Sequence, residues 1–83
     1  MAKSAKKLFG EICNNPRDVR FDVLCRVAEA FGFRHCRTSG SHRLYERDGI
    51  SEPLNLQEVK GKAKPYQVRQ FLKLVEKHSL EIR

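Results

Sequence analysis

The stretch that decides the fold is FRHCRTSGSHRLYERDGISEPLNL, residues 33–56, in which tight turns separate short runs of strand-forming residues. Residues 33–38 and 42–47 are predicted to form two strands joined at residues 39–41, and an Asp-Gly pair marks a second turn before a third strand at residues 52–56. Because links this short join neighbouring antiparallel strands, the stretch predicts a three-stranded antiparallel sheet.

The third strand combines a proline with alternating apolar residues. Pro53 cannot donate a hydrogen bond to a neighbouring strand, so we expect this strand to lie at an edge of the sheet or to begin just after the proline. Leu54 and Leu56 share one face, whereas Asn55 and Gln57 share the other. The alternation therefore predicts that one face of the strand is buried.

Two amphipathic helices flank the strands and predict an α+β fold. The first begins near Phe21 and ends at Gly32, and the second begins at Pro65, which suits the first position of a helix. Packing both helices on one face of the sheet buries their apolar residues and leaves the other face partly open. These residues recur at three- and four-residue intervals: Val23, Leu24, Val27, Ala28 and Phe31 in the first helix, and Val68, Phe71, Leu72 and Val75 in the second.

A shorter helix precedes these elements, with Ser4 as its cap and Asn14-Asn15-Pro16 as its end. Lysines near its start oppose the helix dipole, so we expect this helix to be peripheral and loosely held. The chain is therefore predicted to consist of an N-terminal helical extension, residues 1–17, followed by an α-β-β-β-α domain, residues 18–83.

Length and composition indicate one compact domain, since the chain has 83 residues of which 40% are hydrophobic. The sequence starts without an apolar signal region, and no segment is apolar enough to cross a membrane. Its three cysteines are an odd number without Cys-x-x-Cys spacing, so neither a disulfide framework nor a zinc site is expected. We therefore expect a cytoplasmic protein that does not bind membranes.

The net charge of +7 indicates a polyanionic partner, because a basic surface attracts phosphate groups and releases their counterions. Lys60, Lys62 and Lys64 alternate along a predicted loop with no acidic residue among them. Lysines in such a loop can also be an ordinary solvated face, so charge alone does not decide between the two interpretations.

The three histidines differ in their surroundings, and an imidazole, with a usual pKa of about 6.5, suits proton transfer at neutral pH. His78 lies in the last turn of the closing helix, where the helix dipole favours a cation, and His35 is interpreted as structural or exposed within its strand. His42 follows Gly40-Ser41 at the start of a strand, where the backbone can approach a phosphate closely. His42 is therefore the candidate catalytic residue.

Four segments of the chain bear a family resemblance. They are Phe31-Gly32-Phe33, Gly40-Ser41-His42-Arg43-Leu44-Tyr45, Leu54-Asn55-Leu56-Gln57 and Lys60-Gly61-Lys62-Ala63-Lys64-Pro65-Tyr66-Gln67-Val68-Arg69-Gln70. Together they make roughly residues 19–78 resemble the HicA family of toxin-antitoxin mRNA interferases.

The resemblance implies a double-stranded-RNA-binding-domain-like fold, in which residues 18–83 would form the HicA-like α-β-β-β-α domain. It also implies a toxin that cleaves mRNA with the histidine of Gly-Ser-His, which is His42 in this chain, and a HicB-type antitoxin as partner. Members of the family commonly have a second histidine directly after the first. Here that position holds Arg43, which argues against a mechanism with two adjacent histidines.

The residues themselves allow a mechanism to be written as a hypothesis. His42 would take the proton from a ribose 2′-hydroxyl or donate one to the leaving oxygen, while Arg43 and lysines from the loop stabilise charge that develops on the phosphate. No metal or cofactor is expected, since the sequence has no carboxylate pair and no His/Cys spacing typical of a divalent-ion site. The complementary acid or base stays open among Tyr45, His35 and water. The expected RNA-binding residues are Ser41, Arg43, Lys60, Lys62 and Lys64.

Two alternatives also stay open. A noncatalytic RNA-binding module would recognise the shape of a duplex through phosphate and 2′-hydroxyl contacts. A protein-binding adaptor would show no salt-dependent RNA affinity. For the toxin, we expect an acidic antitoxin that covers His42 and the basic loop.

Overall fold

The computed structural model describes residues 3–82. Met1, Ala2 and Arg83, which fall within the predicted segments 1–17 and 18–83, lie outside the described residues. The elements are α1 (Ala5–Asn14), α2 (Phe21–Ala30), β1 (Arg34–Ser39), β2 (His42–Arg47), β3 (Ile50–Val59), β4 (Lys62–Ala63) and α3 (Pro65–Lys77). None of the helices between residues 3 and 82 is long and apolar enough to cross a membrane.

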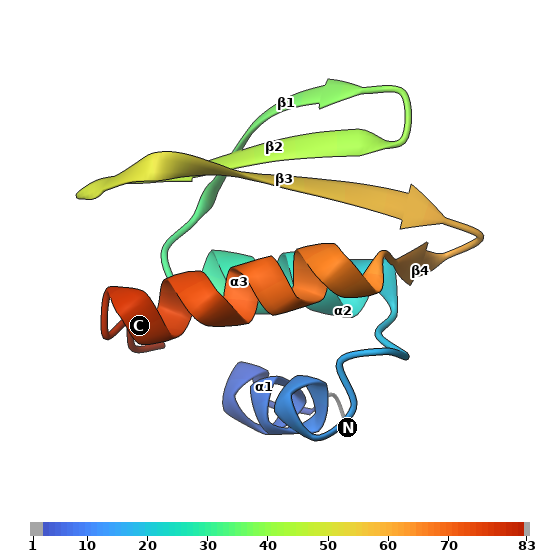
Figure 1. Ribbon diagram of the computed structural model, residues 1–83, viewed down its shortest axis with the longest axis horizontal. Helices are drawn as coiled ribbons and strands as arrows, with labels where there is room; N and C mark the ends of the chain where they lie inside the picture. The colour runs from blue at the N-terminus through green and yellow to red at the C-terminus, as the bar shows by residue number, and fades with distance from the viewer. Residues whose placement is uncertain (1–2, 83) are drawn as a thin grey trace.

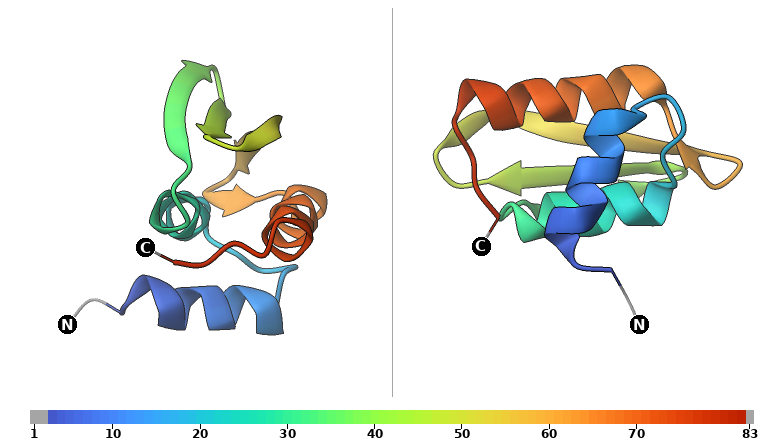
Figure 2. Two further views of the ribbon diagram at one scale, coloured as in Figure 1. Left: turned by 90° about the vertical axis from the view of Figure 1, so that its left-hand side faces the viewer. Right: turned by 90° about the horizontal axis from the view of Figure 1, so that it is seen from below.

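The elements form three layers (Figures 1 and 2). An antiparallel sheet with strand order β1-β2-β3-β4 lies above α2 and α3, which run side by side, and α1 crosses beneath these two helices. The prediction of an α+β fold with two core helices on one face of the sheet is confirmed. The predicted number of strands is wrong, because the sheet has four strands and not three.

The additional strand, β4, lies within the segment predicted as a lysine loop. Lys60 and Gly61 form a two-residue turn with φ angles of 53° and 80°, the left-handed geometry that suits a tight hairpin. On one side of β4, Lys62 pairs with Val59 of β3. On the other, the Ala63 N–H donates to the carbonyl of Val19 at 2.9 Å. Because residues 62 and 63 pair on both sides, this part of the expected loop is a strand.

The third strand is longer than the predicted 52–56 and has neighbours on both sides. Pro53 lies within it, in a stretch where the register with β2 shifts between the pairs Tyr45–Leu54 and Arg47–Ile50. Because β4 pairs only with the far end of β3, the proline faces no second strand. The expected edge position is thus wrong for the strand, although its physical reason holds locally at Pro53.

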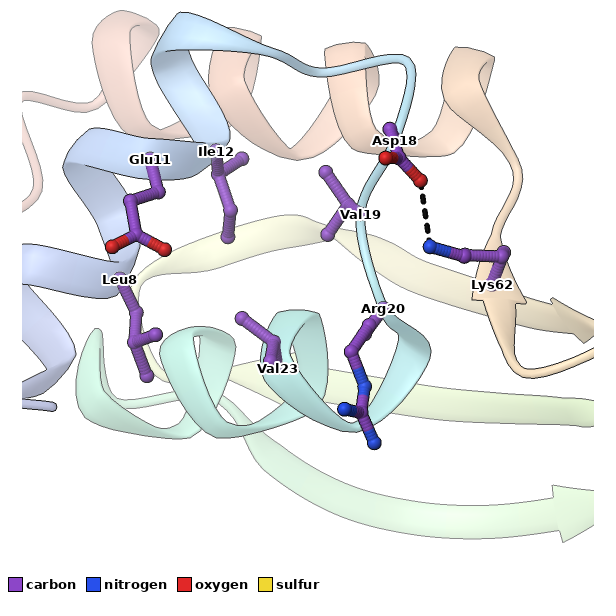
Figure 3. A pocket seen from close by; sticks show the side chains of 8 residues that line it. All are labelled: Leu8, Glu11, Ile12, Asp18, Val19, Arg20, Val23 and Lys62. Atoms are coloured by element: carbon purple, nitrogen blue, oxygen red, sulfur yellow. Dashed lines mark hydrogen bonds and ion pairs between the residues drawn. The ribbon is translucent and has the colours of Figure 1, made fainter. Parts of the chain in front are cut away.

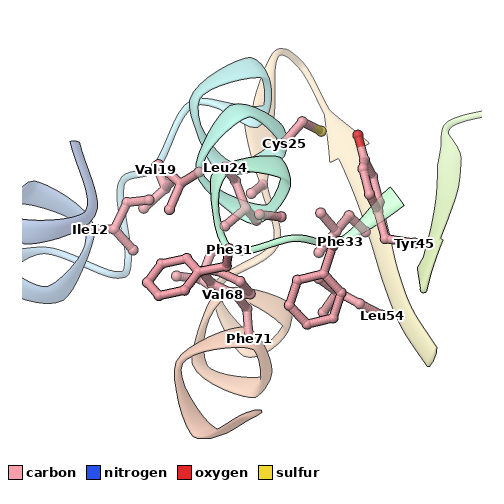
Figure 4. Packing of buried hydrophobic residues seen from close by; sticks show 14 of the residues in the cluster. Ile12, Val19, Leu24, Cys25, Phe31, Phe33, Tyr45, Leu54, Val68 and Phe71 are labelled. Atoms are coloured by element: carbon pink, nitrogen blue, oxygen red, sulfur yellow. The ribbon is translucent and has the colours of Figure 1, made fainter. Parts of the chain in front are cut away.

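Apolar side chains fill the space between the sheet and the helix pair (Figure 4). Leu54 and Leu56 are fully buried, which confirms the face predicted from their alternation. The Phe71 ring meets the edges of Phe31 and Phe33, with ring centroids 5.7 Å and 6.1 Å apart. Burial of each such side chain contributes roughly 1.5–3 kcal/mol. Other fully buried side chains are Leu24, Val27, Tyr45 and Val68.

The N-terminal helix is packed against the core and not loosely held. The Ser4 hydroxyl accepts a hydrogen bond from the Lys7 N–H at 3.2 Å, which confirms the predicted cap. Leu8 and Ile12 are buried, and the Phe9 ring lies with its centroid 4.8 Å from that of Phe31. Burial of one apolar face outweighs the unfavourable lysines at the helix start.

Candidate functional site

His42 lies on the face of the sheet that the helices do not cover. It is the first residue of β2, directly after the Gly40-Ser41 turn, and it pairs with Gln57 of β3. Gly40 has a φ of 61°, a conformation that glycine adopts readily. Since Leu56 is buried against the helices, alternation along β3 directs Gln57, and with it the paired His42, to the open face.

One hydrogen-bond partner orients the His42 ring. Its Nδ1 lies 3.4 Å from the Oδ1 of Asn55, which belongs to the same face of β3. An amide oxygen only accepts hydrogen bonds, so this contact favours the tautomer with the proton on Nδ1. Nε2 makes no hydrogen bond to any residue between 3 and 82. The half-buried ring therefore presents a free lone pair to a substrate.

Arg43 lies on the opposite face of β2. Its guanidinium carbon is 5.3 Å from the centroid of the Phe21 ring, and one of its nitrogens lies 4.0 Å from the sulfur of Cys25. Neighbouring residues of a strand point to opposite faces, so the structure does not bring Arg43 to the His42 imidazole. The expectation that Arg43 stabilises a phosphate at His42 is therefore corrected.

Arg37 lies on the same face of the sheet as His42. It is exposed on β1 and pairs with Leu44, which lies two residues beyond His42 on the same face of β2. Such diagonal neighbours have Cβ atoms roughly 7–8 Å apart, within reach of an arginine side chain. The sequence pattern did not single out Arg37, because the predicted turn at residues 39–41 would pair it with Arg43, whereas the observed two-residue turn pairs Ser39 with His42 and Arg37 with Leu44.

Ser41 fixes the turn against β3. Its carbonyl accepts a hydrogen bond from the Glu58 N–H at 3.0 Å, and its hydroxyl accepts one from the Gln57 side-chain amide at 3.5 Å. Ser41 is also exposed. Its hydroxyl is thus adjacent to His42 and open to a bound molecule.

The three lysines have different surroundings. Lys60 is exposed at the β3–β4 turn, and Lys64 is the residue that caps α3, whose first turn contains no acidic residue. Lys62 instead forms an ion pair with Asp18, with Nζ 2.6 Å from Oδ1. The β3–β4 turn lies at the same end of the sheet as the Gly40-Ser41 turn (Figure 1). Lys60 and Lys64 are therefore the lysines whose charge is free to attract a phosphate at this end.

A buried glutamine connects this end of the sheet to α3. Gln67 is 3% exposed, and its Oε1 accepts a hydrogen bond from the Gln57 N–H at 2.6 Å. The Gln67 side chain thus gives a hydrogen-bond partner to a backbone N–H of β3 that has no partner in the short strand β4. The Gln67 side-chain amide also donates to the Tyr66 hydroxyl at 3.3 Å. The sequence pattern did not single out Gln67, although a polar residue beside the apolar residues of a helix was a usable signal.

The other candidates for proton transfer lie away from His42. His35 is on β1, where its ring stacks at 5.3 Å from Tyr45 and contacts the Thr38 hydroxyl. The Tyr45 hydroxyl donates to Glu29 at 3.3 Å, and burial raises the pKa of this phenol. Because Tyr45 faces the helices, neither Tyr45 nor His35 can act together with the His42 imidazole. Among residues 3–82, no group of three or more His, Cys, Asp or Glu side chains is arranged to hold a metal ion.

A pocket of about 270 Å³ lies on the other side of the helix layer (Figure 3). Lys62 is the only expected site residue that lines it, and there it meets Asp18. The pocket is therefore separate from the open sheet face around His42. Its other lining residues are Leu8, Glu11, Ile12, Val19, Arg20 and Val23.

No family model, no curated protein and no solved structure matches the chain.

Proposed function

We propose that this protein is an endoribonuclease toxin of the HicA type that cleaves mRNA without a metal ion, with His42 as its catalytic residue. The observation that supports this most is the His42 imidazole itself. The ring is oriented through Nδ1 by Asn55 and is free at Nε2, on an uncovered sheet face. The order α2-β1-β2-β3-α3 supports a double-stranded-RNA-binding-domain-like fold, with β4 as an addition.

The proposed reaction uses the ribose as its own nucleophile. Nε2 of His42 takes the proton from a 2′-hydroxyl, and the resulting oxygen forms a bond to the adjacent phosphorus. The bond from phosphorus to the 5′-oxygen breaks, which leaves a 2′,3′-cyclic phosphate on one product and a 5′-hydroxyl on the other. Water supplies the proton to the leaving oxygen, since Tyr45 and His35 lie elsewhere. Turnover by a site with a single protein acid–base group is expected to be slow.

Cations at the same end of the sheet would hold the RNA. Arg37 has its guanidinium on the His42 face, two residues along β1 from the Ser39 that pairs with His42, and it would stabilise charge that develops on the phosphate. Lys60 and Lys64 would contact flanking phosphates, aided by the N-terminus of α3, which no acidic side chain neutralises. Ser41 would donate its hydroxyl to the same strand.

The proposal includes a partner and a location. A cationic ribonuclease would damage the cell that makes it, so we expect an acidic HicB-type antitoxin that covers His42 and the lysines through charge complementarity. Toxin, antitoxin and mRNA would meet in the cytoplasm.

The experiment compares wild type with His42→Ala and with a matched control, His35→Ala, which removes an exposed imidazole from the neighbouring strand. Purified proteins are incubated with RNA in the presence of a chelator, and products and affinities are measured. We expect wild type and His35→Ala to cleave, and His42→Ala to bind RNA without cleaving it. Cleavage that requires a metal ion, or that survives in His42→Ala, contradicts the mechanism. RNA binding without cleavage by any of the three indicates the noncatalytic module instead.

A further inference from the structure

Two large hydrophobic side chains are exposed in residues 3–82: Val59, directly before the β3–β4 turn, and Tyr66, in the first turn of α3. Val59 is 43% exposed and Tyr66 is 55% exposed. Exposed aromatic side chains are enriched where a protein binds a partner. Tyr66 therefore needs an explanation beyond the needs of the fold.

One hydrogen bond, at the hydroxyl, links the exposed Tyr66 ring to the buried Gln67. The Tyr66 hydroxyl accepts from the side-chain amide of Gln67 at 3.3 Å, and the buried Gln67 is itself fixed to the Gln57 N–H at 2.6 Å. A tyrosine on a solvated surface would pass between rotamers freely. Here the exposed ring is tethered to the end of the sheet, so little conformational freedom is lost when a ligand binds to it.

The surroundings of Tyr66 are cationic, and hydrogen bonds through Gln67 and Gln57 link Tyr66 to the turn before His42. Lys64 lies two residues before Tyr66, and Lys60 is at the turn of the adjacent hairpin. The Gln57 side chain also reaches the Ser41 hydroxyl at 3.5 Å, directly before His42. The start of α3 and the two turns share one end of the molecule (Figure 1). One RNA strand can therefore contact the ring and the imidazole together.

We propose that Tyr66 is a stacking platform for an unpaired base of the RNA strand that His42 cleaves. This inference rests on the proposed ribonuclease function and specifies its substrate as single-stranded at the base beside the cleaved phosphate. A base within a duplex is stacked on both faces and cannot cover the ring, whereas an unpaired base can. Lys60 and Lys64 would bind the backbone on either side, which favours RNA over an apolar protein segment.

The test measures equilibrium binding in the His42→Ala background, which is expected not to cleave RNA. Two RNA oligonucleotides of equal length and charge are compared, one of unstructured sequence and one with abasic residues. We expect Tyr66→Leu to weaken binding of the first about 5- to 150-fold and to leave binding of the abasic strand unchanged. Tyr66→Phe should retain most of the preference for bases, because the ring is kept.

The other outcomes contradict the stacking role of Tyr66, and they show whether the proposed ribonuclease function fails with it. If Tyr66→Leu binds the base-containing strand as tightly as its parent, the stacking role fails while RNA binding stands. An equal loss on both strands assigns Tyr66 a structural role only. If no variant binds either strand in a salt-dependent manner, both the stacking role and the ribonuclease proposal fail. Thermal unfolding of each variant, with Tyr66→Phe as reference, excludes misfolding as the cause of a loss.

Discussion

His42 and Arg43 are adjacent in sequence and lie on opposite faces of β2. The imidazole of His42 contacts Asn55 at 3.4 Å on the open face, whereas the guanidinium of Arg43 covers the Phe21 ring on the helix face. His42 and Arg43 are therefore not partners in one site. A guanidinium on the face of His42 comes from a different strand, at Arg37.

This relationship predicts opposite effects for two matched substitutions. If the protein is the proposed ribonuclease, Arg37→Gln removes a guanidinium from the face that would bind the phosphate and should reduce kcat/KM for RNA cleavage by about 10- to 100-fold with little change in stability. Arg43→Gln removes a cation–π contact and should lower the free energy of unfolding by about 1 kcal/mol while cleavage stays nearly unchanged. Urea denaturation and single-turnover cleavage measure the two quantities. If Arg43→Gln reduced cleavage and Arg37→Gln did not, the phosphate would bind on the helix face of β2 and not on the open face.

Asn55 is predicted to be a positioning residue that acts through the His42 ring. Asn55→Asp places a carboxylate at Nδ1, which stabilises the protonated imidazole. The acid limb of the pH–rate profile should then move to higher pH, because the general base must be deprotonated. Asn55→Ala should lower kcat with little change in KM. A profile that does not move in Asn55→Asp argues that the contact at 3.4 Å has no functional role.

Lys60→Asn is predicted to raise stability and to lower RNA affinity, because it relieves backbone strain at the turn and removes a positive charge. Lys60 has a φ of 53°, a conformation that costs most side chains roughly 1–2 kcal/mol, whereas Asn-Gly is a favoured pair for a two-residue hairpin turn. We expect the variant to be up to about 1 kcal/mol more stable than wild type. Its RNA affinity should fall, and the slope of log affinity against log salt should decrease by about one. Unchanged affinity and slope would show that Lys60 does not contact phosphate.

The buried Cys25 and Tyr45 predict a loss of stability at alkaline pH. Burial raises the pKa of the Cys25 thiol and that of the Tyr45 phenol. A group with a higher pKa in the folded protein ionises first in the unfolded chain, so its contribution is complete below the unfolded pKa and is lost as pH rises above it. The free energy of unfolding should fall from about pH 8.5 for the thiol and about pH 10 for the phenol.

For each of these two groups the expected slope is at most about 1.4 kcal/mol per pH unit. Tyr45→Phe lacks the phenol, so its stability should fall less steeply than that of wild type above about pH 10. Urea denaturation at a series of pH values gives both curves. Parallel curves above that pH would exclude the phenol as the cause.

The helices, the turn before His42 and the turn at Asp48-Gly49 were predictable because they depend on local sequence. The period of apolar residues in α2 and α3 and the alternation of Leu54 and Leu56 state which side of each element is buried. β4 was missed for a physical reason. Lysine is unfavourable at the positive φ of the turn. Of the two neighbours of β4, Val59 lies directly before the turn, but Val19 comes from a distant part of the chain, and local sequence does not reveal that contact.

The sequence by itself determined the pattern of burial, and with it the α+β layers, since an apolar side chain loses contact with water in nearly any packing that hides its face. Only the tertiary structure decided which polar groups meet. The His42–Asn55 contact, the placement of Arg37 in preference to Arg43, and the buried Gln67 all depend on strand register and on where β4 stops. Hydrogen bonds are directional and short-ranged, so a shift by one residue would break each of these contacts.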